Sequence, residues 1–378
     1  MMNIIKNITT GLIKNFSNIP GWSTRRKLVI FLVDDWGSIR IPDKAAFEAL
    51  QKAGIDCEGN RFNRYDTLES QHDLSMLFEI LASFKDKNNN SPSFTALTTV
   101  ANLDFDKIRI SDYREYFYEP FTKTLQRYYG TDLPFNLWKE GIKAGIFIPQ
   151  FHGREHINVS LWLKGLQNKD YNLLTAFNQK AIGVPMSNPS KSRGSYLAAF
   201  DFGNESEQDN LKAICKDGLT LFNEIFGYHA TLFTSPCLIH NSNLEPLLAE
   251  NGIQFIDRAK ISHIPLGNGV YRKKYYRLGQ RNDWDQFYIT RNCMFEPNEH
   301  NDSTAVNKAL RDMEISFRCM KPAIISSHRV NFVGSISPGN REHGLRCLKE
   351  LLFKIKTRWP DAEFLKFSDL AEEIKKNN

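Results

Sequence analysis

Two histidines four residues apart, His152 and His156, are the clearest candidates for chemistry in this sequence. They directly follow the apolar run Gly145–Gln150, which we expect to be a short buried strand. The pair would therefore lie on the turn where that strand ends. Neutral imidazoles are common ligands of divalent metals, so this spacing indicates a candidate metal site.

Acidic residues and a third histidine also follow expected strands. Asp34 and Asp35 come directly after the run Leu28–Val33, and His328 follows the run Ala323–Ser326. In folds built from parallel strands, catalytic groups gather at the carboxyl ends of the strands. Two histidines and a carboxylate delivered in this way match a catalytic site for a hard or borderline cation that keeps an open position for water.

Strand-like and helix-like runs alternate along most of the chain, which favours parallel βα units arranged as a barrel or an open sheet. The segment Ser70–Phe84 has apolar residues at helical spacing, and the basic, aromatic stretch Val270–Arg281 is expected to be a loop. We find no internal repeat. The remaining expected strands are Phe94–Val100, Ala230–Thr234, Ile253–Ile256, Gln286–Phe295 and Glu363–Phe367.

Composition narrows the class of protein. With 378 residues and 41% hydrophobic content, the chain can bury a large core as a single domain, which we expect over residues 27–372. The net charge of +6 is dispersed, and no compact basic stripe points to nucleic acid. Six cysteines without close paired spacing are typical of reduced thiols in a cytoplasmic protein. They are Cys57, Cys215, Cys237, Cys293, Cys319 and Cys347.

Residues 1–26 are expected to form a leader outside this domain. The leader lacks the apolar core of a secretory signal, and no run of about 18 apolar residues exists to span a bilayer. It is weakly amphipathic and basic, which suits weak contact with an anionic membrane surface. We therefore expect a cytoplasmic protein, with a membrane-peripheral location as the alternative.

Taken together, these residues resemble the polysaccharide deacetylases of carbohydrate esterase family 4. The resemblance covers about residues 27–367 and is that of a divergent branch whose members act on bacterial surface polysaccharides. The order of the motifs along the chain agrees with the family. The residues that carry the resemblance are the paired aspartates Asp34 and Asp35, the metal-binding histidines His152 and His156, and the late histidine His328.

The resemblance implies a distorted (β/α) barrel of about seven parallel strands that removes an N- or O-linked acetyl group from a saccharide or polysaccharide precursor. One divalent metal, with zinc as the expected ion, would be bound by Asp35, His152 and His156. Asp34 would be the general base. His328, on the opposite side of the metal, would be the general acid.

The sequence departs from the family at a third motif. The run Phe233–Cys237 keeps Pro236 where the family has Arg-x-Pro, but it lacks the arginine, so Arg291 is a candidate to orient Asp34 instead. A backbone N–H near Cys237 is a candidate oxyanion donor, and Arg329 is a further candidate for substrate contact. Structural ion pairs explain both arginines equally well.

Two other functions remain open at this point. His152 to His156 also reads His-x-x-Glu-His, the inverted zinc-protease signature, in which Glu155 would be the base and Glu224 a downstream ligand. That mechanism needs both histidines within a helix, whereas a strand followed by Gly153 favours a turn. The second alternative is a catalytically inactive barrel that binds a glycan, because the third motif lacks its arginine.

Overall fold

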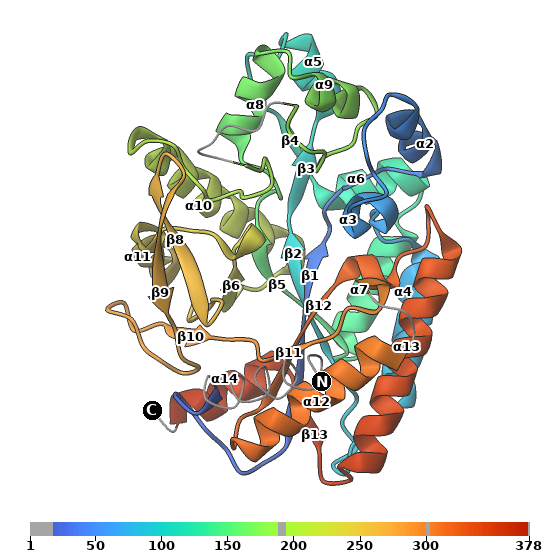
Figure 1. Cartoon of the computed structure of the whole chain (residues 1–378), viewed down its shortest axis with the longest axis vertical. Coiled ribbons are helices and arrows are strands. Elements are labelled where there is room, and N and C mark those ends of the chain that lie inside the picture. The colour runs from blue at the N-terminus through green and yellow to red at the C-terminus, as the bar shows by residue number, and fades with distance from the viewer. Residues whose placement is uncertain (1–17, 188–193, 300–302, 377–378) are drawn as a thin grey trace, which may run out of the picture.

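The computed structural model describes residues 18–187, 194–299 and 303–376. Within these ranges, nine parallel strands form one curled sheet, which confirms the distorted (β/α) barrel (Figure 1). Eight strands follow the order β10-β7-β6-β5-β2-β1-β12-β11, and β13 pairs with β1. The strands are β1 (Leu28–Trp36), β2 (Phe94–Thr99), β5 (Phe147–Gly153), β6 (Leu232–Thr234), β7 (Phe255–Asp257), β10 (Phe287–Ile289), β11 (Cys293–Met294), β12 (Ala323–His328) and β13 (Glu363–Phe364).

Helices cover the outer face of the sheet (Figure 1). No helix in the described ranges combines the length and the apolar character needed to cross a membrane. On one side lie α4 (Gln71–Ser83), α7 (Leu133–Lys143), α12 (Ser303–Arg318) and α13 (Pro338–Arg358), and on the other α10 (Ser206–Phe226) and α11 (Glu245–Glu250). The remaining α-helices are α2 (Lys44–Lys52), α3 (Arg61–Tyr65), α5 (Phe105–Ile110), α6 (Phe121–Tyr129), α8 (Val159–Gln167), α9 (Tyr171–Asn178) and α14 (Phe367–Lys376).

Local sequence explains why α4 begins where expected. Ser70 caps its first turn by accepting from the Asp73 N–H, and the Asp73 carboxylate accepts from the Ser70 N–H in return. Leu74, Leu77 and Leu81 then form the buried face that packs against the sheet. The helix predicted over Ser70–Phe84 is confirmed.

Alternation along β1 sorts its side chains between two cores. Ile30 and Leu32 point into the barrel and pack with Leu370 of α14, which lies across the amino ends of the strands. Phe31 and Val33 point outward and pack with the helices that cover the sheet. Because successive side chains on a strand alternate between faces, the inward row continues after Leu32 to position 34.

The single strand expected over Gln286–Phe295 is wrong. The segment forms two short strands, β10 and β11, which lie at opposite edges of the sheet. Residues 290–292 therefore cross the gap between the two edges of the sheet. The barrel is closed there by this connecting segment and not by hydrogen bonds between strands. The apolar pattern of the sequence indicates that both pieces are strands. It does not show that the two pieces pair with different strands.

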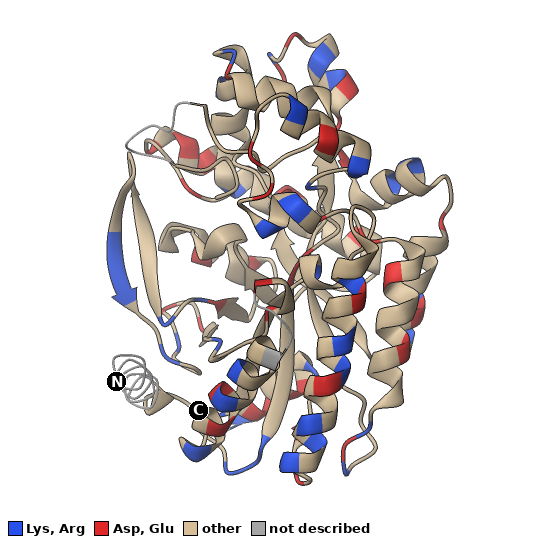
Figure 2. Cartoon of the chain, turned by 45° about the vertical axis from the view of Figure 1, so that its right-hand side comes forward, with Lys and Arg blue, Asp and Glu red and all other residues tan. Residues whose placement is uncertain are grey.

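The loop expected over Val270–Arg281 is also wrong in its first half. There β8 (Ile261–Gly267) and β9 (Val270–Tyr275) form an antiparallel hairpin. Asn268 and Gly269 join them with φ of 51° and 72°, the left-handed conformations that an Asn-Gly hairpin turn requires. The basic residues on β9, visible in Figure 2, are Arg272, Lys273 and Lys274.

The predicted leader is described only from residue 18 onward, and residues 1–17 lie outside the described ranges. The Trp22 N–H donates to the carbonyl of Leu278 at 2.7 Å, and the Thr24 N–H donates to the carbonyl of Met320 at 2.8 Å. Residues 18–26 are thus hydrogen-bonded to segments that are distant in sequence and belong to the barrel.

Gly344→Ala tests whether the support behind β12 is close-packed. Gly344 of α13 faces the turn Arg329–Phe332 that follows β12, and an added Cβ would lie 1.7 Å from the carbonyl oxygen of Asn331. Overpacking against backbone is expected to lower the free energy of unfolding by about 3 kcal/mol in urea denaturation. Gly339→Ala, on the same helix with no atom within 4 Å of the new Cβ, is the control. Equal stability of the two variants would contradict this packing.

Candidate metal and catalytic site

The inward-facing rows of the barrel become polar at the carboxyl ends of the strands. On β1, Asp34 follows Leu32 on the inner face, and on β12, Ser326 and His328 follow Ile324. Asp34 and His328 are direct register partners on adjoining strands. The same alternation that places apolar side chains inside the barrel near the amino ends of the strands therefore places a carboxylate and an imidazole side by side at the carboxyl ends.

Asp35 faces the same site because the backbone leaves regular strand geometry there. By alternation its side chain would point outward, away from that of Asp34. Instead Asp35 has φ of 76°, and the pairing of β1 with β2 shifts register between Val33 and Trp36. Such a bulge re-aims a side chain. Both carboxylates are buried, with exposed fractions of 7% for Asp34 and 6% for Asp35.

Asp35, His152 and His156 form a compact group. Asp35 Oδ1 lies 3.3 Å from His152 Nε2 and 3.2 Å from His156 Nε2. One donor atom from each of the three residues lies within 4.8 Å of the others, and no other such group of His, Cys, Asp or Glu occurs in the ranges that the structure describes. His152 comes from the end of β5, and His156 from the bend that follows it.

The donor atoms of this group suit a metal ion. The carbonyl of Thr234 lies 2.8 Å from His152 Nδ1, which must therefore carry the proton, so the lone pair is on Nε2. His152 Nε2 is buried without a hydrogen-bond partner. Ligands about 2.0–2.1 Å from a tetrahedral ion are separated by about 3.3 Å, which matches the distance from Asp35 Oδ1 to each imidazole. The residues present fit one divalent cation.

Asp34 does not share this group but pairs with an arginine. Arg291, in the segment that crosses the barrel gap, donates from Nη1 to Asp34 Oδ2 at 2.6 Å and from Nη2 to Asp34 Oδ1 at 2.7 Å. Its Nε donates to Asp257 of β7 at 2.8 Å. Burial raises the pKa of Asp34, but the charge and hydrogen bonds of Arg291 outweigh it and hold this pKa below its ordinary value.

His328 is held between two carboxylates. Its Nδ1 lies 2.6 Å from Glu296 Oε1, and its Nε2 lies 3.5 Å from Asp34 Oδ2. Glu296 is itself fixed by Arg61 at 2.6 Å and Asn331 at 2.7 Å. Burial lowers the pKa of His328, but the charge and hydrogen bond of Glu296, followed by the charge of Asp34, raise it to about 9. The imidazole is therefore protonated at neutral pH.

The expected placement of His328 on the opposite side from Asp34 differs from the structure. The two side chains are neighbours because β1 and β12 adjoin and residues 34 and 328 are partners in register. A carboxylate and an imidazole thus lie side by side, close to the group of Asp35, His152 and His156.

The other two predicted contact residues, Arg329 and Cys237, differ in their exposure to solvent. Arg329 is fully buried and donates to Asp66 at 3.0 Å and Glu69 at 2.9 Å, so its guanidinium forms a structural ion pair and has no surface for a substrate. Cys237 is exposed, in a backbone turn with φ of 58°. Desolvation by the surrounding protein, followed by the charge of Asp35, raises the pKa of its thiol to about 11. Its backbone role stays a prediction.

The geometry argues against the inverted zinc-protease arrangement. His152 lies on a strand and His156 in a bend, so the two are not on one helix. Both carboxylate oxygens of Glu155 accept from Arg154, at 2.6 and 2.7 Å. Glu224 is exposed on α10 and is not part of the metal-binding group.

Sequence reasoning missed two residues of the site. Thr234, which fixes the tautomer of His152, and Asp257, which shares Arg291 with Asp34, had no assigned role. Each is at or just after the carboxyl end of an expected strand, which is the one signal that could have found them.

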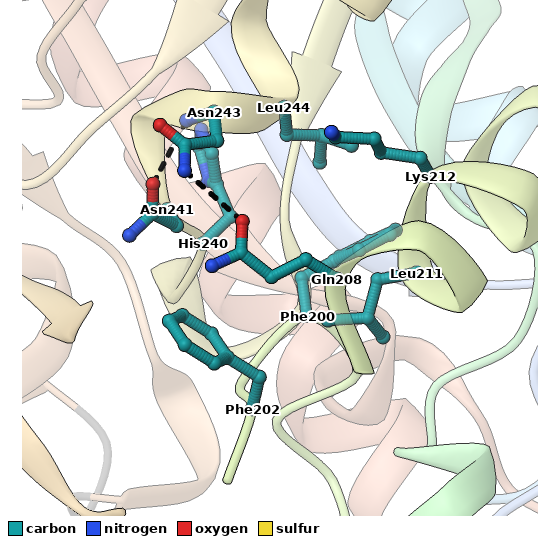
Figure 3. Close-up of a pocket in the computed structure, with 9 residues that line it drawn as sticks. All are labelled: Phe200, Phe202, Gln208, Leu211, Lys212, His240, Asn241, Asn243 and Leu244. Carbon is teal, nitrogen blue, oxygen red and sulfur yellow. Dashed lines mark hydrogen bonds between the residues drawn. The ribbon is translucent and has the colours of Figure 1, made fainter. Parts of the chain in front are cut away.

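A separate cavity lies near His240 and is lined by Phe200, Phe202 and Gln208 (Figure 3). Asn243 closes one wall with a hydrogen bond of 3.0 Å to Gln208. The cavity is partly open, and its volume of about 20 Å³ leaves room for about one water molecule. It is too small for a saccharide and does not compete with the site at the strand ends.

Metal content tests the donor group directly. We expect the purified protein to bind one zinc ion per chain, and Asp35→Asn or His156→Ala to lower the affinity at least 100-fold, because each removes a ligand from a three-residue set. Mass-spectrometric metal analysis and competition with a chelator measure this. His72→Ala, an exposed histidine on α4, is the control. Full zinc affinity in Asp35→Asn would contradict the assignment.

The protonation of His328 can be measured without the metal. We expect an NMR titration of the metal-free protein to give a pKa near 9 for His328. Glu296→Gln removes the negative charge that raises it, so the pKa should fall toward about 6.5, the ordinary value for histidine. His72, on the surface, serves as the internal reference. A pKa of 6.5 in the unmodified protein would rule out the Glu296 pairing.

No protein-family model matches this chain, and no curated protein matches its sequence. Solved structures do match. A proposed glycoside hydrolase/deacetylase from Parabacteroides distasonis is 8% identical, with a TM-score of 0.51 over 95% of this chain and 74% of its own. Proposed polysaccharide deacetylases from Mycobacterium smegmatis (12% identical, TM-score 0.43, 95% of this chain and 93% of its own) and Pseudomonas aeruginosa (9%, 0.47, 92% and 91%) are also similar. This chain has the fold of the Parabacteroides structure.

Proposed function

We propose that this chain is a metal-dependent hydrolase that removes an N- or O-linked acetyl group from a saccharide, in bacterial surface polysaccharide metabolism. One observation carries the proposal. A metal-binding group, a carboxylate held ionised by an arginine, and an imidazole held protonated by a carboxylate meet at one end of the barrel. This set meets the needs of acyl hydrolysis, and it agrees with the resemblance to polysaccharide deacetylases.

Asp35, His152 and His156 would hold the metal. Two nitrogens and one oxygen suit zinc, and three protein ligands leave a position open. When bound, such an ion supplies Lewis acidity to the attacking water and to the substrate carbonyl. The hydrogen bond from His152 Nδ1 to the Thr234 carbonyl keeps the imidazole in the tautomer that this role requires.

Asp34 would accept the proton of the attacking water. Its lowered pKa keeps it ionised at neutral pH, and the two-pronged contact with Arg291 fixes the orientation of its carboxylate. Arg291 therefore takes the place of the arginine that the third motif lacks. That absence was the reason to consider an inactive barrel, and the contact between Arg291 and Asp34 supports an active one.

His328 would donate a proton to the departing amine or alkoxide. Nδ1 is engaged by Glu296, so Nε2 is the donating atom, and it faces the site beside Asp34. With a pKa of about 9 the proton is present at neutral pH. Proton transfer by such a positioned group accelerates reactions roughly 10²–10⁴-fold.

Asp34→Asn separates catalysis from metal binding. An amide cannot accept the proton, so acetate release from N- and O-acetylated oligosaccharides should fall by roughly 10²–10⁴ while zinc content is unchanged. Enzyme-coupled acetate detection and metal analysis give the two readouts. Asp73→Asn, which breaks an equally buried pair with Arg341 elsewhere in the fold, is the matched control. Undiminished acetate release from Asp34→Asn would overturn the proposal. Activity that is abolished in Glu155→Gln but kept in Asp35→Asn would favour a metallopeptidase.

A further inference from the structure

Arg40 is a buried arginine that has no carboxylate partner. Its exposed fraction is 7%, and its Nε donates to Asn63 Oδ1 at 3.1 Å. Among the residues that the structure describes, no carboxylate oxygen lies within 4.0 Å of the guanidinium. Within the described ranges, Nη1 and Nη2 make no hydrogen bond, and neither is among the buried atoms without a partner. Both nitrogens of this charged group therefore keep some contact with solvent.

Other buried arginines of this protein are each paired with an acid. Arg258 contacts Glu245 at 2.8 Å, and Arg341 contacts Asp73 at 2.9 Å. Burying an unpaired charge is strongly unfavourable, because protein cannot replace the water it loses. An arginine kept in this state indicates a partner that arrives from outside the chain.

The guanidinium lies beside the metal-binding group. The charge of Asp66 and, after it, that of Asp35 act on Arg40. Arg40 Cζ lies 5.3 Å from the centre of the Phe62 ring, and the same ring lies 5.1 Å from that of His328. A group bound by Arg40 would therefore be next to the carbonyl on which Asp34 and His328 act.

The surroundings hold Arg40 in one place. Asn63 is itself 1% exposed, and the Ile182 N–H donates to the Arg40 carbonyl at 2.9 Å. Gly183 has φ of +85°, and a Cβ there would come within 2.4 Å of Arg40 Nε. A side chain at position 183 would thus displace the guanidinium. These contacts hold the Nε side of the guanidinium in place and leave its Nη atoms free to bind another group.

We propose that Arg40 binds a negatively charged group of the substrate, a carboxylate or a phosphate, close to the acyl group that is removed. The inference rests on the proposed function and makes the substrate an acidic saccharide. The planar pair of Nη groups matches two oxygens of a carboxylate or phosphate, and such charge-assisted contacts are strong in a partly desolvated site.

A purely structural role is the rival explanation. Arg40 is near Asp66, whose charge acts on it. Asp66, however, already accepts two N–H groups of Arg329. If Arg40 only balanced this acid, its replacement would lower stability without changing which saccharides bind.

Calorimetric titration of the zinc-loaded protein distinguishes the two roles. The probes are an N-acetylated hexuronate, its neutral uronamide, and N-acetylglucosamine 1-phosphate. We expect one of the two anions to bind on the order of 30-fold or more tightly than the uronamide, and the preferred anion identifies the carboxylate or phosphate source. Arg40→Met should bind all three alike, and Arg40→Lys should keep part of the preference.

Arg341→Met is the matched control, because it removes a buried arginine that already has its acid. It should keep the preference of the unmodified protein. Equal binding of anionic and neutral probes by the unmodified protein, no binding of any probe, or an undiminished preference in Arg40→Met would each overturn the inference. Selective anion binding without any acetate release would refute the proposed function alone. Equal acetate release from uronate and uronamide would refute the role of Arg40 alone.

Discussion

Two consecutive aspartates on a regular strand point to opposite faces of the sheet, and the site depends on how the chain avoids this. The left-handed conformation at Asp35, with the shift in register beside it, turns the second carboxylate to the side of the first. Aspartate tolerates this conformation better than most residues, although it still stores strain. Asp34 then lies against Arg291 and His328, whereas Asp35 faces the imidazoles of the other two histidines of the site. One backbone distortion thus separates the proposed proton acceptor, Asp34, from the proposed metal ligand, Asp35.

Burial raises the pKa of each acid of this site, so the placement of cations decides which carboxyl group is the more acidic. Arg291 lies between Asp34 and Asp257, and it affects them unequally. The pKa of Asp34 lies below its ordinary value, whereas burial keeps that of Asp257 above its own despite the same arginine. Asp257 also retains a buried oxygen without a partner. Asp257 therefore helps to orient the guanidinium, and Asp34 is the more acidic of the two carboxyl groups.

Local pattern predicted the strands and the residues at their ends, because alternation and apolar runs are properties of neighbouring residues. It did not predict which residues would meet across the barrel. Arg291 and Asp34 are 257 positions apart, and their contact depends on where the chain crosses between sheet edges after β10. That crossing lies inside a segment read as one continuous strand. The pairing of Glu296 with His328 could not be predicted either, because nothing in the sequence distinguishes Glu296 from a member of an ordinary ion pair.

Phe62 lies between the proposed general acid, His328, and the proposed anion-binding residue, Arg40. Its ring contacts both Arg40 and His328, at 5.3 and 5.1 Å, so the guanidinium and the imidazole cannot be more than about 10 Å apart. A ring buttressed on two sides has little freedom to change that separation. The negative charge that Arg40 would bind must therefore be on the sugar that carries the acyl group or on its immediate neighbour. A charge farther along a polymer could not reach Arg40 while the acyl carbonyl stays at the metal-binding group.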